Sequence, residues 1–477
     1  MIQRAYGLAT DLYQLTMAAA YFDNGMHREK ATFEMFVRSL PKNRGYLIAA
    51  GLEQALDYLQ TLQFTEEQID YLRTHPTFRY VSRDFFNYLA ALRFTGEVYA
   101  VPEGSIVFGM EPLLRITAPI IEAQLIETYL LATINFQTMV ASKAARLVMA
   151  AQGRNIVEFG TRRAHGAEAG LLAARAAYIA GCVGTSNVEA GHLFGIPTFG
   201  TQAHSFVMSF DDEGEAFAAF LKVFPETATM LVDTYNTIEA VEKLTRMNVR
   251  IPAIRLDSGD LLSLSIRCRE ILDAAGMTDT RILASNDLDE WIIADLLERG
   301  AKIDAFGVGT QLATSFDRPA LGGVYKLVSL EQGGKISLKI KLSQDKASYP
   351  GAKQIWRKFD ADGKYAGDLI ATDGESPPSE GQGSWQSLVE PVMRSGKALE
   401  ERLLLEDAAD LQQYRDVRAA RLARLNQARQ RAANDLERLP RELLALDVSA
   451  KYPVTFSDYL ITERERRREQ LLSKQGE

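Results

Sequence analysis

The chain is poor in the residues that build disulfides and metal centres. Its 477 residues include two cysteines, Cys182 and Cys268, and five histidines, and there is no CxxC motif. A disulfide framework needs more cysteines, and a structural zinc site needs clustered cysteine and histidine ligands. Both are therefore disfavoured, and a reducing compartment is expected.

A basic surface and a membrane-spanning segment are also missing. Lysine and arginine number 54 against 62 acidic residues, giving a net charge of −8 and a pI near 5.5, so the global basic footprint of a nucleic-acid-binding protein is absent. The longest charge-free stretch, Ala190–Phe210, contains Gly, Pro, His and Gln and makes a poor membrane span. The first residues lack a signal-peptide pattern. We expect a cytoplasmic protein with no nucleic-acid and no membrane partner.

The length of the chain and the changes in its hydrophobic pattern predict three domains. A chain of 477 residues exceeds the size of a single hydrophobic core. Residues 1–120 mix helical and extended signals and should form an α+β domain. Residues 121–330 should form an α/β barrel. Residues 331–477 should form a partly helical region that packs on the N-terminal domain.

Between residues 155 and 330, short apolar runs alternate with amphipathic stretches, which indicates a parallel sheet. The runs are Ile156–Phe159, Cys182–Thr185, Pro197–Gly200, Thr229–Asp233, Ala253–Asp257, Ile282–Ser285, Ala305–Val308 and Gly323–Val328. About eight such units favour an irregular (β/α) barrel, and a doubly wound open sheet is the alternative.

Five further segments carry local signals. Residues 120–150 predict a long helix or a helix pair, and Gly96–Val107 predicts paired strands broken by Pro102. Glu331–Ser343 reads as a hairpin around Gly333-Gly334. Residues 373–384 read as a loop, and Ala398–Leu446 as largely helical.

Polar residues follow the apolar runs, and in a barrel these positions share one rim. The clusters are Gly160–Arg163, Ser186-Asn187, Thr201–Ser205, Thr234–Asn236, Arg255–Asp260, Asn286-Asp287 and Gly309-Thr310. Arginines, carboxylates and Gly-Thr turns together suit a phosphorylated, metal-chelated anion. A strand that ends in an Asx-turn before a helix is the plainer reading of any single cluster. No GxxxxGK[ST] motif occurs, and no G-x-G-x-x-G turn opens the β/α region.

His204 is the histidine with the clearest chemical setting. Alone, a histidine in such a turn is more often a structural hydrogen-bonding group than a catalyst. Asp233, however, ends a neighbouring strand and could orient the ring, which would leave the other ring nitrogen nucleophilic. None of the histidines are paired at metal-ligand spacing, so a histidine metal site is not expected.

With these motifs identified, the chain resembles nicotinate phosphoribosyltransferases. The matching stretches are TDLYQLTM (10–17), FEMFVRSLPKNRGYLIAAGL (33–52), EFGTRRAHG (158–166), GTSNVEAG (184–191), GTQAHSFVMSF (200–210), VDTYN (232–236), RLDSGDL (255–261), ASND (284–287), FGVGTQL (306–312) and PALGGVYKLV (319–328). These stretches lie in order along residues 10–328, and the last 150 residues contribute little to the resemblance.

The resemblance implies a fold and a reaction. The fold would be an irregular (β/α) barrel of the type II phosphoribosyltransferase kind, with an N-terminal α+β domain and a helical C-terminal extension. The reaction would be Mg²⁺-dependent transfer of phosphoribose from phosphoribosyl pyrophosphate (PRPP) to nicotinate in NAD salvage. ATP would be a co-substrate through a transient phosphohistidine, as in an ATP-dependent ligase, and a homodimer would share its active sites.

The resemblance also implies roles for individual residues. His204 would be phosphorylated, with Asp233 orienting it, and Phe159 and Tyr13 would sandwich the pyridine ring, Tyr13 coming from the partner subunit. Arg255, facing the nicotinate, and Asp257 are the other catalytic candidates. The other substrate-binding candidates are Thr161, Arg162, Ser186, Thr201 and Arg38. Asp257 and Asp233 are the metal candidates, and the phosphate candidates are Asn286, Gly309, Thr310 and Lys326.

Ser186 bears on the choice between nicotinate and nicotinamide. Relatives that use nicotinamide carry an acidic residue at this position, whereas a neutral serine tolerates a substrate carboxylate. Four alternatives stay open: a nicotinamide phosphoribosyltransferase, a quinolinate phosphoribosyltransferase, a barrel aldolase or isomerase, and a non-catalytic sugar-phosphate-binding barrel.

Overall fold

The computed structural model describes residues 5–247, 249–342, 348–379, 383–400 and 408–473. The chain forms two compact units, and each is assembled from separate stretches of sequence. The first comprises Met1–Thr138, Ala320–Val417 and Arg431–Glu477, and the second comprises Met139–Pro319 and Arg418–Gln430. The division into domains 1–120, 121–330 and 331–477 stays a prediction.

Within the described residues, the first unit is built on an antiparallel sheet of seven strands in the order β13-β12-β1-β5-β3-β17-β18. The strands are β1 (Lys30–Val37), β3 (Glu97–Ala100), β5 (Pro112–Pro119), β12 (Gly323–Gln332), β13 (Lys335–Leu338), β17 (Glu390–Arg394) and β18 (Lys397–Ala398). Residues after 330 therefore complete the sheet that the N-terminal residues begin.

The first unit also holds a sheet of four described strands, in the order β16-β14-β15-β19. These are β14 (Lys353–Phe359), β15 (Tyr365–Thr372), β16 (Ser384–Ser387) and β19 (Val454–Phe456), and β2 (Leu47–Ile48) pairs with β4 (Ile106–Val107). The helices are α1 (Leu12–Asp23), α2 (Leu52–Thr61), α3 (Glu66–Thr74), α4 (Arg83–Ala91), α5 (Ile120–Leu125), α16 (Arg441–Leu444) and α17 (Asp458–Ser473). Two longer helices, α6 (Glu127–Ala150) and α15 (Leu411–Arg438), contribute to both units.

The expected helix pair and hairpin are both present. Residues 120–150 form α5 and α6. The hairpin joins β12 to β13, and its turn residues Gly333 and Gly334 have φ of 54° and 76°, which glycine adopts without a steric penalty. Residues 343, 380–382 and 401–407 of the expected hairpin, loop and helical segment lie outside the described residues.

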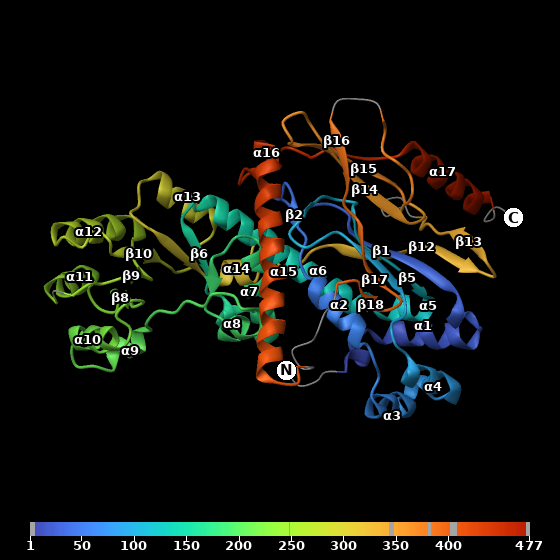
Figure 1. Ribbon diagram of the computed structural model, residues 1–477, viewed down its shortest axis with the longest axis horizontal. Coiled ribbons are helices and arrows are strands. Elements are labelled where there is room, and N and C mark those ends of the chain that lie inside the picture. The colour runs from blue at the N-terminus through green and yellow to red at the C-terminus, as the bar shows by residue number, and fades with distance from the viewer. Residues whose placement is uncertain (1–4, 248, 343–347, 380–382, 401–407, 474–477) are drawn as a thin grey trace. The chain divides into compact units, whose positions relative to one another are not determined.

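The second unit contains a parallel sheet whose six described strands lie in the order β7-β6-β11-β10-β9-β8. The strands are β6 (Asn155–Glu158), β7 (Gly184–Thr185), β8 (Thr229–Leu231), β9 (Ala253–Leu256), β10 (Arg281–Ala284) and β11 (Ala305–Val308). The sheet is curled like part of a barrel, and the helices lie outside it (Figure 1). The predicted fold class is thus confirmed.

The described helices of the second unit are α7 (Ala167–Ile179), α8 (Val188–Phe194), α9 (His204–Met208), α10 (Glu213–Val223), α11 (Thr237–Arg246), α12 (Leu261–Ala274), α13 (Glu290–Glu298) and α14 (Thr310–Ala313). Several of them begin at side-chain caps. Asn187, Asn236, Asp260 and Asp289 each accept a hydrogen bond from the backbone of the following helix. The plainer reading of polar strand ends therefore holds for Asn187, Asn236 and Asp260, which belong to the polar clusters.

Three expected strands differ from the structure. The run Pro197–Gly200 is not a strand in the described chain, although Thr198 makes an isolated parallel bridge to Thr185. Gly323–Val328 is the start of β12 in the first unit, because its pairing is antiparallel with β1. The strands within Gly96–Val107 do not pair with each other: β3 pairs with β5 and β17, and β4 with β2.

The segment from Thr198 to Gln202 joins the two edge strands of the curled sheet. At one end Thr198 bridges to β7. At the other, the side-chain oxygen of Gln202 accepts a hydrogen bond from the backbone N–H of Leu231 in β8, at 3.2 Å. This segment takes the place of a strand where the ring of strands is incomplete.

The middle of α15 belongs to the second unit and caps two of its helices. Arg429 donates to the backbone carbonyls of Tyr178, Gly181 and Cys182 at the end of α7, and its guanidinium lies 4.6 Å from the ring centroid of Tyr178. Arg418 donates to the carbonyl of Gly191 in α8. Cations are stabilising at helix C-termini, where carbonyls lack partners.

Two of the sequence-based exclusions can be compared with the structure. Both cysteines are free and buried. Among the described helices, none has both the length and the apolar character needed to cross a bilayer.

Candidate active site

The carboxyl ends of the six parallel strands surround a cavity of about 690 Å³ in the second unit. Parallel strands place these ends on one edge of the sheet, so residues distant in sequence meet there. The predicted site residues that line this cavity are Phe159, Thr161, Arg162, Ser186, Thr201, His204, Arg255, Asp257, Asn286, Gly309 and Thr310.

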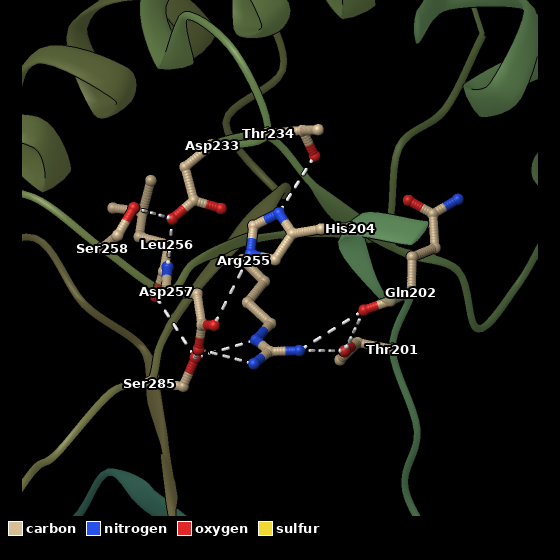
Figure 2. A network of polar contacts seen from close by, with 10 residues as sticks. All are labelled: Thr201, Gln202, His204, Asp233, Thr234, Arg255, Leu256, Asp257, Ser258 and Ser285. Atoms are coloured by element: carbon tan, nitrogen blue, oxygen red, sulfur yellow. Dashed lines mark hydrogen bonds and ion pairs between the residues drawn. The ribbon is translucent and has the colours of Figure 1, made fainter. Parts of the chain in front are cut away.

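Arg255, on β9, is the centre of the polar network in the cavity (Figure 2). Its Nη2 donates to Asp257 Oδ1 at 2.5 Å, and its Nη1 donates to Thr201 Oγ1 at 2.7 Å. Its Nε donates to Ser285 Oγ at 2.8 Å, and its side chain is only 12% exposed. The guanidinium is therefore fixed before any substrate binds.

Asp257 follows β9, and its surroundings favour the ionised form of its carboxyl group. Burial acts to raise the pKa of this carboxyl. The hydrogen bond from Ser285 and the charge of Arg255 outweigh burial, so the pKa lies below the ordinary value of 3.8. A carboxylate is thus available at neutral pH to face a cation.

His204 begins α9, and its ring lies between Thr234 and Asp257 (Figure 2). Nδ1 is 3.2 Å from Thr234 Oγ1, and Nε2 is 3.8 Å from Asp257 Oδ2. The side chain is 43% exposed, so the ring is open to a ligand in the cavity. A partner on Nδ1 leaves Nε2 as the nitrogen that can react.

Asp233, which follows β8, is not where it was expected relative to His204. Its Oδ2 accepts from the backbone N–H of Asp257 at 2.8 Å and from Ser258 Oγ at 2.7 Å. The adjacent Thr234 takes the expected position on the histidine ring. Asp233 therefore holds the turn after β9, and the interpretation that it orients His204 is corrected.

The residues fit a magnesium ion that is shared with a substrate. Asp233 Oδ1 is buried and has no hydrogen-bond partner among the described residues. Groups of three or more His, Cys, Asp or Glu that could hold a metal are absent from the described chain. Mg²⁺ is commonly held by one or two carboxylates together with waters and substrate phosphates, so Asp233 and Asp257 are the residues that would hold it here.

Phe159 follows β6 and lies against the backbone of β11. A Cβ atom added at Gly307 would come within 2.4 Å of Phe159 Cδ2, so only glycine at this position admits the ring. The guanidinium of Arg255 is 5.9 Å from the ring centroid. An aromatic face beside a cation is suited to a flat anionic ring.

Glu158, fully buried at the end of β6, ties two strands together behind the cavity. It accepts from Thr185 Oγ1 at 2.5 Å and from the backbone N–H of Gly160. Burial raises the pKa of Glu158, although both hydrogen bonds act to lower it. The contacts fix the strand ends that carry Phe159 and Ser186.

The remaining side of the cavity offers groups for phosphates. Arg162 and Arg163 lie in an exposed turn, Thr161–Arg163. Gly309 and Thr310 follow β11, and Asn286 follows β10 with φ of 118°, a left-handed value that is uncommon outside glycine. Such backbone strain is concentrated at binding sites.

Three predicted residues belong to the first unit: Tyr13 on α1, Arg38 after β1 and Lys326 on β12. Tyr13 is 50% exposed. Their roles stay predictions.

Known protein families match three consecutive parts of the chain. Family models match residues 8–135 (nicotinate phosphoribosyltransferase N-terminal domain), 154–338 (nicotinate phosphoribosyltransferase family) and 352–463 (nicotinate phosphoribosyltransferase C-terminal domain). "Nicotinate phosphoribosyltransferase pncB2" of Mycobacterium tuberculosis is 42% identical over 98% of this chain and 95% of its own length. The chain belongs to the nicotinate phosphoribosyltransferase family.

Other members of the family support this assignment. Nicotinate phosphoribosyltransferase of Bacillus subtilis is 43% identical over 76% of each chain. The crystal structure of human nicotinic acid phosphoribosyltransferase covers 96% of this chain and 99% of that one at 28% identity, with a TM-score of 0.81. The likeness extends through residue 463, so the expectation that the last 150 residues add little is wrong.

Sequence reasoning gave no role to several residues of the nicotinate phosphoribosyltransferase site. Ser285, Thr234, Gln202, Phe199 and Arg163 line the cavity or contact residues that do. All of them lie within or shortly after apolar runs in the sequence, so their position at the strand ends could be inferred from it. Their partners were not, because hydrogen bonding between strand ends depends on the order of strands in the sheet.

Proposed function

We propose that this chain transfers phosphoribose from PRPP to nicotinate, giving nicotinate mononucleotide and pyrophosphate in NAD salvage. The observation that carries the proposal is the convergence of Arg255, Asp257 and His204 on one cavity of a chain in this family. The bond between the ribose anomeric carbon and pyrophosphate breaks with its electron pair passing to pyrophosphate. The nicotinate ring nitrogen supplies the pair for the new bond, so no strong general base is required.

The residues act mainly by position and charge. Phe159 offers a face to the pyridine ring, and Arg255 and Arg162 offer N–H donors to its carboxylate. Asn286, Gly309 and Thr310 line the part of the cavity proposed for the phosphates. Bound Mg²⁺ would neutralise charge that develops on pyrophosphate, and Asp233 and Asp257 are the residues that would hold it.

ATP coupling through His204 is the finer part of the proposal. Attack of Nε2 on the terminal phosphorus of ATP would form phosphohistidine and release ADP, and hydrolysis would later return the free ring and phosphate. The contact of Nδ1 with Thr234 and the 43% exposure of the side chain support this role. A phosphate on Nε2 would add negative charge near Asp257 that a bound Mg²⁺ could balance.

The experiment compares wild type, His204→Ala and His165→Ala with nicotinate and PRPP, with and without ATP. His165 is an exposed histidine outside the cavity lining and serves as a control. His204→Ala should lose ATP stimulation and acid-labile phosphate labelling yet keep slow transfer, and His165→Ala should behave as wild type. Absence of nicotinate mononucleotide with the wild type would refute the transferase, and ATP stimulation of His204→Ala would refute the phosphohistidine.

Preference for nicotinate over nicotinamide follows from the charge of the cavity. Ser186 is neutral, and the arginines Arg162, Arg163 and Arg255 line the same cavity. Ser186→Asp should lower kcat/KM for nicotinate at least tenfold, because like charges repel at short distance. Faster turnover of nicotinamide by the wild type would refute the preference.

The homodimer with shared active sites and the cytoplasmic location are part of the same proposal. Tyr13, exposed on α1, is the residue that a second copy would supply. Light scattering of the purified protein tests the dimer, and mixing Tyr13→Ala with a cavity variant tests the shared site by recovery of activity.

A further inference from the structure

Ser285 stands between two charged residues of the cavity and contacts both. It directly follows β10 and is 3% exposed. Its hydroxyl oxygen accepts from Arg255 Nε at 2.8 Å, and its proton is directed to Asp257 Oδ1. A third, longer contact of 3.4 Å reaches the carbonyl of Leu256. One hydroxyl thus joins β10 to the charged end of β9 (Figure 2).

We propose that Ser285 is a positioning residue that holds Arg255 in the orientation in which it meets the substrate. The inference rests on the proposed transfer to nicotinate and deepens it. Ser285 does not touch the substrate in this account. It acts through the guanidinium and through the carboxylate that pairs with it.

The donors of Arg255 show why its orientation depends on Ser285. Among the described residues, Nε is bonded to Ser285, Nη2 to Asp257, and Nη1 to Thr201 and, at 3.4 Å, to the carbonyl of Gln202. Arginine has five N–H groups, so one N–H, on Nη2, is left for a ligand. Which way that N–H points is set by the other four bonds.

Removing the hydroxyl would release both ends of the pair. Nε would lose its acceptor, and the guanidinium could rotate about its last side-chain torsions. Asp257 Oδ1 would keep only Arg255 as a partner among the described residues. A catalytic group displaced by about 1 Å can lose on the order of 100-fold in rate.

The test is a double-mutant cycle on kcat/KM for nicotinate with the full-length chain. Ser285→Ala should lower kcat/KM about 10- to 100-fold, the range for a lost hydrogen bond to a charged group. In an Arg255→Lys background the same change should cost less than about threefold, because lysine has no Nε–H to be held.

Ser265→Ala is the matched control. Ser265 is a fully buried serine of α12 in the same unit, and its hydroxyl donates to Leu262 O at 2.9 Å and accepts from the Lys302 N–H at 3.1 Å. Ser265→Ala removes a comparable pair of bonds away from the cavity and should leave kcat/KM within about twofold of wild type. An equal loss from Ser285→Ala in both backgrounds, or an equal loss from Ser265→Ala, would overturn the proposal.

The same double-mutant cycle is also measured by urea unfolding. Ser285→Ala and Arg255→Lys should be non-additive in the free energy of unfolding, and additivity would refute the contact itself. This readout needs no turnover. If the wild type fails to make nicotinate mononucleotide, the proposed function fails, while the unfolding cycle still decides whether Ser285 holds Arg255.

Discussion

Thr234 Oγ1 lies 3.2 Å from Nδ1 of His204, in the position expected for the carboxylate of Asp233. The difference matters chemically. A carboxylate can only accept from the ring, whereas a hydroxyl can accept or donate. The contact with Thr234 can therefore persist whether or not Nδ1 carries a proton, which is compatible with the phosphorylation proposed for Nε2.

Thr234→Val should reduce ATP stimulation of nicotinate transfer roughly fivefold, because the ring loses the hydrogen bond that orients Nε2. Thr234→Ser keeps the hydroxyl and should retain most of the stimulation. The measurement is the ratio of initial rates with and without ATP. Equal ratios for wild type and Thr234→Val would mean that the hydroxyl does not orient His204.

Gly307→Ala should weaken nicotinate binding, because the new Cβ would come within 2.4 Å of Phe159 Cδ2 and force the ring away from β11. We expect KM for nicotinate to rise about three- to tenfold, as roughly 1 kcal/mol of ring stacking is lost. Steady-state kinetics with saturating PRPP measures it. Gly322→Ala, whose Cβ would meet no atom within 4 Å, is the control and should leave KM unchanged.

The pKa of Asp257 predicts how acid affects stability. Its pKa in the folded chain lies below the ordinary value of 3.8, so ionised Asp257 stabilises the fold fully above that value. The contribution is lost as the pH falls through the folded pKa. The difference in unfolding free energy between wild type and Asp257→Asn should therefore shrink when the pH is lowered from about 6 to about 3. Urea titrations across this range test it, and a constant or growing difference would count against the ionised pair.

Glu290 should be a major contributor to the stability of the second unit. It is fully buried and pairs with Lys143 at 2.5 Å and Arg146 at 2.9 Å. Glu290→Ala leaves two buried cations without this counterion and should lower the unfolding free energy by about 3–5 kcal/mol.

Tryptophan fluorescence reports this change directly. Lys143 and Arg146 lie 5.2 and 5.3 Å from the ring of Trp291, so its emission should shift when they move. Glu298→Ala, an exposed change on the same helix, should alter stability by no more than about 0.5 kcal/mol. Similar losses from both variants would show that the buried ion pairs contribute little.

The parallel sheet was predictable because its strands are apolar runs closed by polar residues, as at Ala253–Asp257. Gly323–Val328 has the same local pattern and was assigned to the barrel. Its true partner is β1, nearly 300 residues earlier, and a local pattern does not encode a partner. The prediction of a strand at Pro197–Gly200 was wrong for a related reason. The segment makes an isolated bridge at Thr198, and a single bridge does not form a strand.

The sequence was sufficient to predict which residues meet in the candidate site. It was less informative about the contacts that each residue makes there. Arg255 lies on β9 and Asp257 directly follows that strand, so the proximity of these two residues follows from the sequence. The choice between Asp233 and Thr234 depends on the direction in which a short turn after β8 points its side chains. Asp233 contacts the Asp257 N–H and the Ser258 hydroxyl in the turn after the neighbouring strand β9, and sequence spacing does not reveal these contacts.

The capping contacts of Arg429 have a consequence for how the chain is made. The barrel strands end at residue 308, yet the carbonyls at the end of α7 receive their arginine only from residue 429, in the segment Arg418–Gln430. At typical synthesis rates of about 5–20 residues per second, roughly 6–24 s separate the synthesis of residue 308 from that of residue 429. During that interval the nascent second unit lacks the hydrogen bonds from Arg429. Until α15 emerges, this unit is therefore exposed to chaperone binding and to misassembly.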